Sequence, residues 1–467
     1  MKRSSMKKPN ILFNNSFAVL TSFLTLFIVS NSYAAQQPLT FKKAIKIAQR
    51  NDPWLEGSRH KEQSLMRLSY AANTEQDPKI SLGFANLPTN GFNFSQERMT
   101  QFKVGISQMF ARGDSLKIKN EQFQLQSQQQ PFQRQDRVNK MAVTVGSLWL
   151  DLYRVQQSIV LIEKNRSLFE QLSEVAEASY GSGLGKTRQQ DIVRAQLELT
   201  RLEDKLNQLQ QQDDSYQAML AQWLTTYSVN SKYNHTDKVL SIITFPLKVS
   251  HEKPEIELIN HASVYSKQRL LAEKLAALLS LHPAIKNIDK KIAATKTNIK
   301  LAEQQYHPQW GINASYGYRA DDELGNSRAD LFSVGVILDV PLFTENRQDN
   351  AVKSAISKTE AVKTEKLLLL RKLMSAFTRN KGKLIRLTER EVLYQDKLLP
   401  QIHDQAEASL TAYTNDDGDF AEVVRSRIAE LNAEIDFLGI NVQKQKIILE
   451  INYLFAGFFV HQQAGEK

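Results

Sequence analysis

The stretch SYGSGLGKTRQQDIVRAQLEL, Ser179 to Leu199, places a glycine-rich run between two segments with apolar residues at helical spacing. A phosphate-binding loop also ends in Gly-Lys-Thr, but it needs its first glycine at position 180, which holds Tyr180. It also needs a buried strand before the loop, whereas residues 161–178 have the pattern of an amphipathic helix. We therefore interpret the stretch as the tip of a helical hairpin, where glycine allows a tight reversal of the chain.

The composition indicates long elements with few interruptions. The chain has 467 residues, of which 42% are hydrophobic and 24% charged, but only 12 prolines and 18 glycines. It has no cysteine, which excludes disulfides, thiol catalysis, cysteine-ligated zinc and lipidation of an N-terminal cysteine. Its eight histidines show no paired metal-ligand spacing. We find no catalytic constellation, so we expect no enzyme activity and no cofactor or metal.

The N-terminus has the pattern of a secretory signal peptide over residues 1–34. Basic residues precede the apolar run Ala18–Val29, and Ser32-Tyr33-Ala34 offers small residues for cleavage. A run of 12 residues is shorter than the roughly 20 that a membrane-spanning helix needs. Cleavage removes four positive charges and no acids, which takes the net charge from +10 to +6. We see no basic cluster that indicates nucleic acid, and no later apolar run of 18 residues, so membrane insertion would require strands.

The sequence contains an internal repeat at an offset of 230 residues. A further pair of matching segments lies at an offset of 231. We therefore predict two structural repeats, residues 35–253 and 254–467. The matches are Asp52-Pro53 with His282-Pro283, Asp77-Pro78 with His307-Pro308, Val104-Gly105-Ile106 with Val334-Gly335-Val336, and Asp191-Ile192-Val193-Arg194 with Glu422-Val423-Val424-Arg425.

Each repeat contains a predicted strand pair, near residues 79–109 and 309–340. Apolar residues alternate there with small or polar ones over about ten residues, as in transmembrane β-strands. A half-buried soluble hairpin has the same pattern, but the signal peptide and the polar connections favour a membrane. The residues predicted to face lipid are Ile80, Leu82, Phe84, Phe102, Val104, Ile106, Trp310, Ile312, Tyr316, Phe332, Val334 and Val336.

The remaining segments predict long helices that pack as coiled coils. Apolar residues recur every three or four positions before the glycine-rich stretch, after it, and again near the C-terminus. Residues 113–178 predict a nearly continuous helix of roughly 100 Å, with Pro131 as a possible kink. A cytosolic coiled coil or a spectrin-like bundle has the same periodicity, but the secretory signal and the strand pairs argue against both.

Four strands per chain predict an oligomer. A barrel needs about eight strands before its interior fills with side chains, and an open sheet edge in lipid leaves backbone groups unpaired. Several subunits must therefore contribute to one barrel. Physical reasoning alone allows eight, twelve or sixteen strands.

The chain resembles the TolC-like outer-membrane efflux proteins over nearly all of the predicted mature sequence. The resemblance is most specific at Tyr180, Gly183, Asp191 and Arg194-Ala195-Gln196, and Leu399-Pro400 before the second tip also fits. It implies a mainly α-helical homotrimer in the bacterial outer membrane, with a twelve-stranded β-barrel continued by a long periplasmic α-helical barrel. It also implies an equatorial region, which we place near residues 226–253 and around the C-terminal residues.

The resemblance implies a passive exit duct that docks to a periplasmic adaptor and an inner-membrane pump. The implied adaptor-docking tip comprises Tyr180, Gly181, Gly183, Gly185, Asp191 and Arg194. The second tip, near residues 413–420, implies a periplasmic gate of Asp416, Asp417 and Asp419. Asp419 has an alternative role as the cap of a helix starting at Phe420, and the other two as turn residues.

Within the family, the heavy-metal cation efflux branch is the one that the sequence favours. Asn86-Leu87-Pro88 is similar to the heavy-metal cation efflux branch. Drug efflux and type I protein secretion are alternatives within the same class. A secreted coiled-coil scaffold without a pore is the alternative from a different class.

Overall fold

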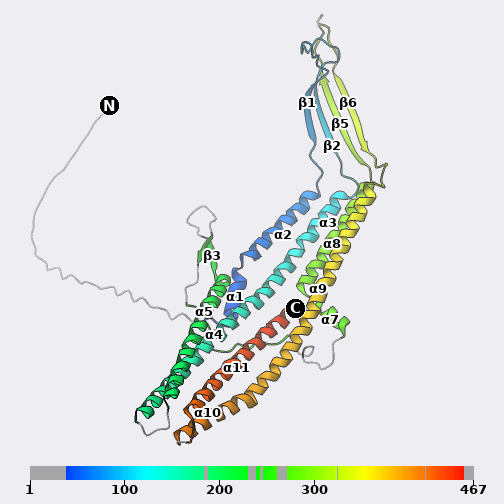
Figure 1. Ribbon diagram of the computed structural model, residues 1–467. Helices are drawn as coiled ribbons and strands as arrows, with labels where there is room; N and C mark the ends of the chain where they lie inside the picture. Colours follow the sequence, from blue (N-terminus) through cyan, green and yellow to red (C-terminus); the bar gives the residue numbers. More distant parts are fainter. Residues whose placement is uncertain are drawn as a thin grey trace, which may run out of the picture. The chain divides into compact units, whose positions relative to one another are not determined.

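The computed structural model describes residues 38–182, 188–229, 238–241, 246–259, 264, 271–322, 324–415 and 417–456 (Figure 1). By its internal contacts the chain divides into two units, Met1–Pro38 and Leu39–Lys467. The predicted signal peptide, Gly183, Gly185 and Asp416 lie outside the described residues. The elements described below belong to the second unit.

Four antiparallel strands form one sheet in the order β1-β2-β5-β6. The strands are β1 (Lys79–Ala85), β2 (Gln101–Met109), β5 (Gln309–Tyr318) and β6 (Leu331–Asp339). They fall within the two regions that the alternation predicts. Strand β2 pairs with β5, so the two strand pairs, far apart in sequence, join edge to edge into a single sheet.

A helix runs into or out of each strand of this sheet. Helix α2 (Pro53–Ala72) precedes β1 and α3 (Ser115–Ser127) follows β2, while α8 (Pro283–Glu303) precedes β5 and α9 (Gln348–Leu393) follows β6. These helices pack in the order α2-α3-α8-α9, which is the order of their strands (Figure 1). The helical layer therefore continues the sheet strand by strand.

Two helical hairpins extend from this layer. Helices α4 (Gln129–Ser182) and α5 (Gln189–Leu224) form the first, and α10 (Leu399–Thr414) and α11 (Phe420–Leu454) form the second. Helix α4 packs against both α5 and α11. Apolar residues at the predicted heptad positions form their shared core, with Val155, Ile162, Ala195, Leu206, Leu209, Val424 and Leu431 among the buried ones.

The helix predicted over residues 113–178 is interrupted between α3 and α4. The break lies at Gln128, three residues before Pro131. Proline has no N–H to donate to the carbonyl four residues earlier, and its ring crowds that carbonyl. Helix α4 itself has 54 residues and is about 80 Å long.

A π-helical turn, η2 (Tyr394–Leu398), joins α9 to α10 immediately before Pro400. Since Pro400 cannot donate the regular helical hydrogen bond, the wider turn is a local way to continue the helix past it. A 3₁₀ turn, η1 (Gln304–Tyr306), ends α8 before β5. No helix in the described ranges combines the length and apolar character that a bilayer-spanning helix needs.

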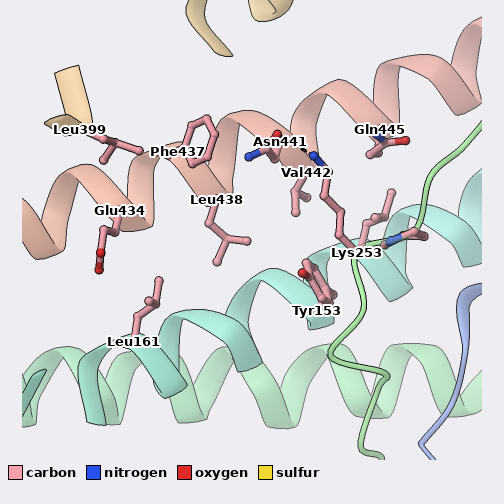
Figure 2. Close-up of a pocket in the computed structure, with 12 residues that line it drawn as sticks. Tyr153, Leu161, Lys253, Leu399, Glu434, Phe437, Leu438, Asn441, Val442 and Gln445 are labelled. Atoms are coloured by element: carbon pink, nitrogen blue, oxygen red, sulfur yellow. Dashed lines mark hydrogen bonds between the residues drawn. The ribbon is translucent and has the colours of Figure 1, made fainter. Parts of the chain in front are cut away.

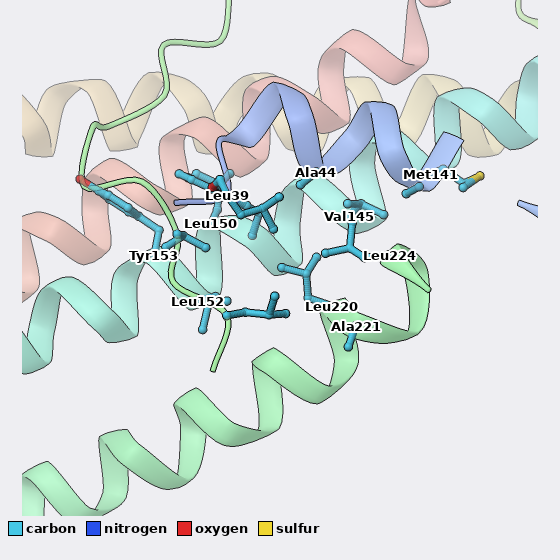
Figure 3. Close-up of a cluster of buried hydrophobic side chains, with 14 of the residues drawn as sticks. Leu39, Ala44, Met141, Val145, Leu150, Leu152, Tyr153, Leu220, Ala221 and Leu224 are labelled. Atoms are coloured by element: carbon cyan, nitrogen blue, oxygen red, sulfur yellow. Dashed lines mark hydrogen bonds between the residues drawn. The ribbon is translucent and has the colours of Figure 1, made fainter. Parts of the chain in front are cut away.

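A compact apolar cluster around Trp149 joins α1 (Phe41–Asn51), α4 and α5 (Figure 3). The Trp149 Nε1 donates to the Leu39 carbonyl at 2.8 Å, and Leu39 pairs in parallel with Val249. The segment 246–259 is thereby held against the long helices. A small hairpin, β3 (Thr226–Val229) and β4 (Lys238–Ser241), precedes it, and α7 (Ala272–Leu279) packs against α9.

Several elements recur at the offset of the sequence repeat. Pro53 begins α2 and Pro283 begins α8, and the residue before each proline caps its helix. The Asp52 Oδ1 accepts from the Trp54 N–H at 3.1 Å, and the His282 Nδ1 accepts from the Ala284 N–H at 3.2 Å. Strand β5 begins at Gln309, 230 residues after β1 begins at Lys79.

Candidate functional site

The first helical tip joins α4 to α5. Helix α4 continues to Ser182, so no strand precedes the glycine-rich run, and the phosphate-loop interpretation has no support in the structure. Tyr180 is 50% exposed, and no described atom lies within 4 Å of a Cβ built on Gly181. Gly183 and Gly185 are outside the described residues. The described part of the tip thus presents an accessible aromatic ring beside an open glycine.

Asp191 fixes the start of the returning helix. Its Oδ2 accepts from the Arg188 N–H at 2.9 Å, and its side chain is buried although it is a carboxylate. In the first turn of α5 this carboxylate satisfies a helix N-terminal N–H and lies at the positive end of the helix dipole. Arg194, one turn further along, is exposed. Asp191 therefore organises the tip, while Tyr180 and Arg194 are available at its surface.

The second tip joins α10 to α11, and Asp419 caps the second of these helices. Its Oδ1 accepts from the Ala421 N–H at 3.1 Å, and α11 begins at Phe420, as the capping alternative predicts. Asp417 is exposed, and its N–H donates to the Ala412 carbonyl at 2.9 Å. Asp416 lies outside the described residues. Asp419 thus has a structural role at this tip, and the gate role of all three aspartates stays a prediction.

Gly418 is a tip residue that the sequence reasoning did not single out. A Cβ at this position would lie 2.5 Å from the Tyr413 nitrogen and 2.7 Å from the Ala412 carbonyl carbon. Both atoms belong to the backbone, so they cannot move aside as a flexible side chain would. The position of this glycine just before the Asp419 cap could have indicated a restricted tip residue, since glycine is common where a helix ends.

The twelve residues predicted to face lipid lie on one face of the sheet. The register places Leu82 opposite Val104, Val104 opposite Tyr316, and Tyr316 opposite Phe332, which makes one apolar row across all four strands. All twelve side chains are exposed except Phe102, which is partly buried. An apolar face of this extent is unusual for a soluble monomer and marks a contact with lipid or protein.

The opposite face of the sheet is mostly polar or small, with Met109, Leu331 and Ile337 as its larger apolar residues. The row beside the apolar one consists of Ser81, Gly105, Ser315 and Ser333, paired in register across the four strands. Lys103, in the next row, is exposed. Alternation of an apolar outer face with a small or polar inner face is the pattern of strands in outer-membrane barrels.

Aromatic rings lie near both ends of the apolar face. Phe94, in the connection from β1 to β2, contacts Phe84 edge to face, with 5.8 Å between the ring centroids. It also stacks on Tyr318, with 6.2 Å between the centroids. At the other end of the strands, Phe110 stacks on Trp310 at 4.2 Å. Aromatic girdles in these positions flank the lipid-facing band of membrane barrels.

A charged network links α10 to α11 behind the second tip. Arg427, largely buried, donates to Glu407 at 2.6 Å and to Glu430 at 2.8 Å. The His403 Nδ1 lies 2.6 Å from the other oxygen of Glu430. The hydrogen bond to Glu430 raises the pKa of His403, and the hydrogen bond from Arg427 lowers the pKa of Glu407. The network holds the two helices together with mutually compensated charges.

An open cavity of about 340 Å³ lies between α4 and α11, below Leu399 of α10 (Figure 2). Its walls are mostly apolar, and Lys253 crosses it to donate to Asn441 at 2.9 Å. Burial raises the pKa of Glu434 in this wall, and the neighbouring Glu430 raises it further. Within the described residues no group of three or more His, Asp or Glu side chains is arranged to hold a metal ion.

The sheet and the long helical hairpins together form a fold that solved outer-membrane channels share. No protein-family model matches the sequence, and neither does any curated protein. Solved structures do match. The structure of CusC, a protein that forms a transmembrane channel, superposes on this chain with a TM-score of 0.67 at 14% identity. The match covers 89% of this chain and 91% of that one.

Two further matches are outer-membrane proteins. VceC from Vibrio cholerae gives a TM-score of 0.67 at 13% identity, over 89% of this chain and 96% of that one. The CmeC outer membrane channel from Campylobacter jejuni gives 0.65 at 12% identity, over 89% and 85% of the two chains. These matches confirm the predicted TolC-like fold.

Proposed function

We propose that this chain is an outer-membrane exit duct of a tripartite efflux system, with a large periplasmic part. The observation that carries the proposal is the exposed apolar face of the four-stranded sheet, flanked by aromatic rings and continued by long helices. Lipid is the partner that suits this face, because the opposite face is mostly polar or small. The likeness to solved outer-membrane channels supports the same placement.

The duct is a homotrimer in this proposal. Strands β1 and β6 are the edges of the sheet, and within the described residues neither pairs with a further strand. In lipid such edges leave backbone groups unsatisfied, which costs several kcal/mol for each group. Three copies would supply twelve strands, enough to close a barrel, whereas one copy supplies four.

Energy and direction come from partners in this proposal. The tip with Tyr180, Gly181, Asp191 and Arg194 docks a periplasmic adaptor, which connects the duct to an inner-membrane pump. The exposed ring and open glycine at this tip support a contact surface. The chain itself conducts passively and catalyses no reaction.

The chain consists of two repeats in this proposal, residues 35–253 and 254–467, with residues 226–253 in an equatorial region. The recurrence of prolines, helix caps and strand starts at one offset supports a duplicated unit. The cluster around Trp149 in Figure 3 anchors the segment 246–259 to that unit.

Conductance in planar bilayers tests the duct. Purified protein should give discrete, long-lived channels, because a closed barrel with a polar interior conducts ions. A secreted scaffold without a pore would give none, and that result would reject the proposal. Heavy-metal cation export, drug export and type I secretion are versions of one duct, and growth of a deletion strain on metals and drugs distinguishes metal export from drug export.

The second tip forms the narrow periplasmic end of the duct in this proposal. Asp416 and Asp417 from three subunits would place six carboxylates around one axis, which attracts cations. Replacing both by Asn should lower cation selectivity and weaken block by divalent ions in single-channel recordings. Unchanged selectivity and block would leave the two residues as turn formers.

A further inference from the structure

A second open cavity, of about 560 Å³, lies among α4, α9 and α11. Figure 1 shows these three helices side by side. Leu387, Val442 and Ile447 contribute apolar surface to it, and each is more than nine-tenths buried. The volume is within the range of small-molecule sites in proteins. This cavity is named the basic groove below.

Positive charge predominates around the basic groove. Five cationic side chains line it, against two carboxylates. The Lys446 Nζ lies 2.7 Å from the Asp151 Oδ2, and Arg386 pairs at 2.6 Å with Glu389 on its own helix. The remaining lining charges are three cations, Arg154, Lys383 and Arg390, and one carboxylate, Glu450.

Two of these cations are free to meet an anion. Arg154 comes from α4 and Lys383 from α9, so they approach the groove from different helices. Within the described part of the chain neither has a carboxylate at ion-pair distance, and Arg390 lies over the ring of Tyr394 at 5.9 Å. An anion in the groove would therefore gain charge-assisted hydrogen bonds without displacing an existing pair.

The basic groove lies on the uncovered side of α4 and α11. The segment 246–259 contacts the other side, where Gln156 donates to the Leu247 carbonyl at 2.9 Å and Gln445 accepts from the Ile256 N–H at 3.2 Å. At about 100° per residue, Arg154 is rotated by roughly 200° around α4 from Gln156. Lys446 is rotated by roughly 100° around α11 from Gln445. The groove and the covering segment thus lie on different faces of the same helices.

We propose that the basic groove binds amphipathic organic anions, with their apolar body on Leu387, Val442 and Ile447 and their carboxylate or sulfonate between Arg154 and Lys383. Guanidinium and ammonium groups both bind such acids. A small inorganic anion has no apolar body, so it would not make the contact with the apolar residues. Organic cations are repelled by the same charges. In the proposed helical barrel, the side of the helices that segment 246–259 does not cover faces the lumen. The contact of the groove with cargo therefore rests on the proposed function.

Binding of three related dyes tests the ligand class. The protein is placed in nanodiscs of zwitterionic lipid, with empty nanodiscs as blank, and titrated with dansylglycine, dansylamide and dansylcadaverine, which are anionic, neutral and cationic. Dansylglycine should bind about tenfold more tightly than either of the other two, and added salt should weaken it. Equal affinity for the anionic and neutral dyes would overturn the proposal.

Paired substitutions test the location. Arg154→Gln with Lys383→Gln should weaken dansylglycine about tenfold and leave dansylamide unchanged. Lys372→Gln removes an exposed charge from the same helix α9, away from the groove, and should bind as the wild type does. If the double variant fails to fold, each single variant should lose part of the affinity, and wild-type affinity in both would overturn the proposal.

Channel conductance of the same samples separates this inference from the proposed function. Wild-type channels that conduct but do not distinguish the dyes would reject the anion site and keep the duct. Selective binding of dansylglycine without conductance would keep the site and reject the duct.

Discussion

At the scale of single residues, His282 combines deep burial with an incomplete set of hydrogen bonds. It is 1% exposed, its Nδ1 caps α8, and its ring lies edge to face on Tyr453 at 4.8 Å. Its Nε2 has no hydrogen-bond partner among the described residues. Burial lowers the pKa of His282; Asp136 and the Tyr453 backbone oppose this effect, and Lys140 adds to it. The cap requires an unprotonated Nδ1, so the neutral imidazole is the form that fits.

This burial predicts a loss of stability in acid. In the unfolded chain this histidine takes up a proton at an ordinary pKa of about 6.5, whereas in the folded protein its pKa is lower. The contribution of His282 to the free energy of unfolding is therefore full above about pH 6.5 and falls as the pH decreases toward the folded pKa. His282→Asn keeps a capping oxygen but does not titrate. Relative to this variant, the wild type should lose up to about 1.4 kcal/mol of unfolding free energy per pH unit.

Denaturant unfolding at several pH values measures the difference. His60→Asn, at an exposed position of α2, is the matched control for the loss of a histidine side chain. Parallel curves for the wild type and His282→Asn below about pH 6.5 would contradict the assignment.

Gly418 gives a second prediction at this scale. Gly418→Ala should cost about 1–3 kcal/mol, because the new Cβ meets the backbone of Ala412 and Tyr413. Gly181→Ala at the first tip should be nearly neutral, since its Cβ would meet no described atom within 4 Å. Hydrogen exchange of the Asp417 amide, which donates to the Ala412 carbonyl, reports the change. Equal protection of the Asp417 amide in both variants would show that the backbone of the second tip accommodates the new Cβ without loss of stability.

Local signals predicted some of these residues and missed others. The Asp419 cap follows from an acidic residue just before an apolar-periodic segment, and Asp191 from an acid in the first turn of a helix. The strict requirement at Gly418 and the burial of His282 depend on atoms brought together by the fold. A spacing pattern does not contain those distances.

At the scale of elements, periodicity predicted the strands and the long helices because each buries one repeating face. The break at Gln128 lies close to the predicted kink at Pro131. The π turn before Pro400 was not predicted, since a proline indicates a disturbed helix but not how the chain accommodates it. The basic groove was not predicted either, because its charges come from three helices.

The heptad core gives a prediction on α4. Ile162 is fully buried, whereas Val160, two residues earlier, is 44% exposed. Ile162→Ala should cost about 2–5 kcal/mol through lost burial and the cavity left behind, and Val160→Ala should change stability by no more than about 0.5 kcal/mol. Denaturant unfolding compares them. A large loss in Val160→Ala would reveal that this exposed position is covered in the assembled protein.

At the scale of the whole molecule, the pairing of β2 with β5 joins segments about 200 residues apart, and the alternation pattern did not predict it. Alternation fixes which face of a strand is apolar but leaves its neighbour open. The order α2-α3-α8-α9 follows from the sheet order, since a short connection joins each helix to its strand. The edges β1 and β6 are consequently the places where another copy must pair if the sheet closes.

Proline substitutions in β1 test that closure. In a strand, successive N–H groups point to opposite sides, so one of Ser81 and Leu82 donates toward β2 and the other toward the open edge. In a single chain only one of Ser81→Pro and Leu82→Pro would remove a ladder hydrogen bond, because proline is tolerated on the free side of an edge strand. In a closed trimeric barrel both N–H groups are paired, and both substitutions should reduce the heat-modifiable trimer on gels. Ser81→Ala and Leu82→Ala are the matched controls, and a proline variant with as much trimer as its alanine control would show that the β1 edge is unpaired.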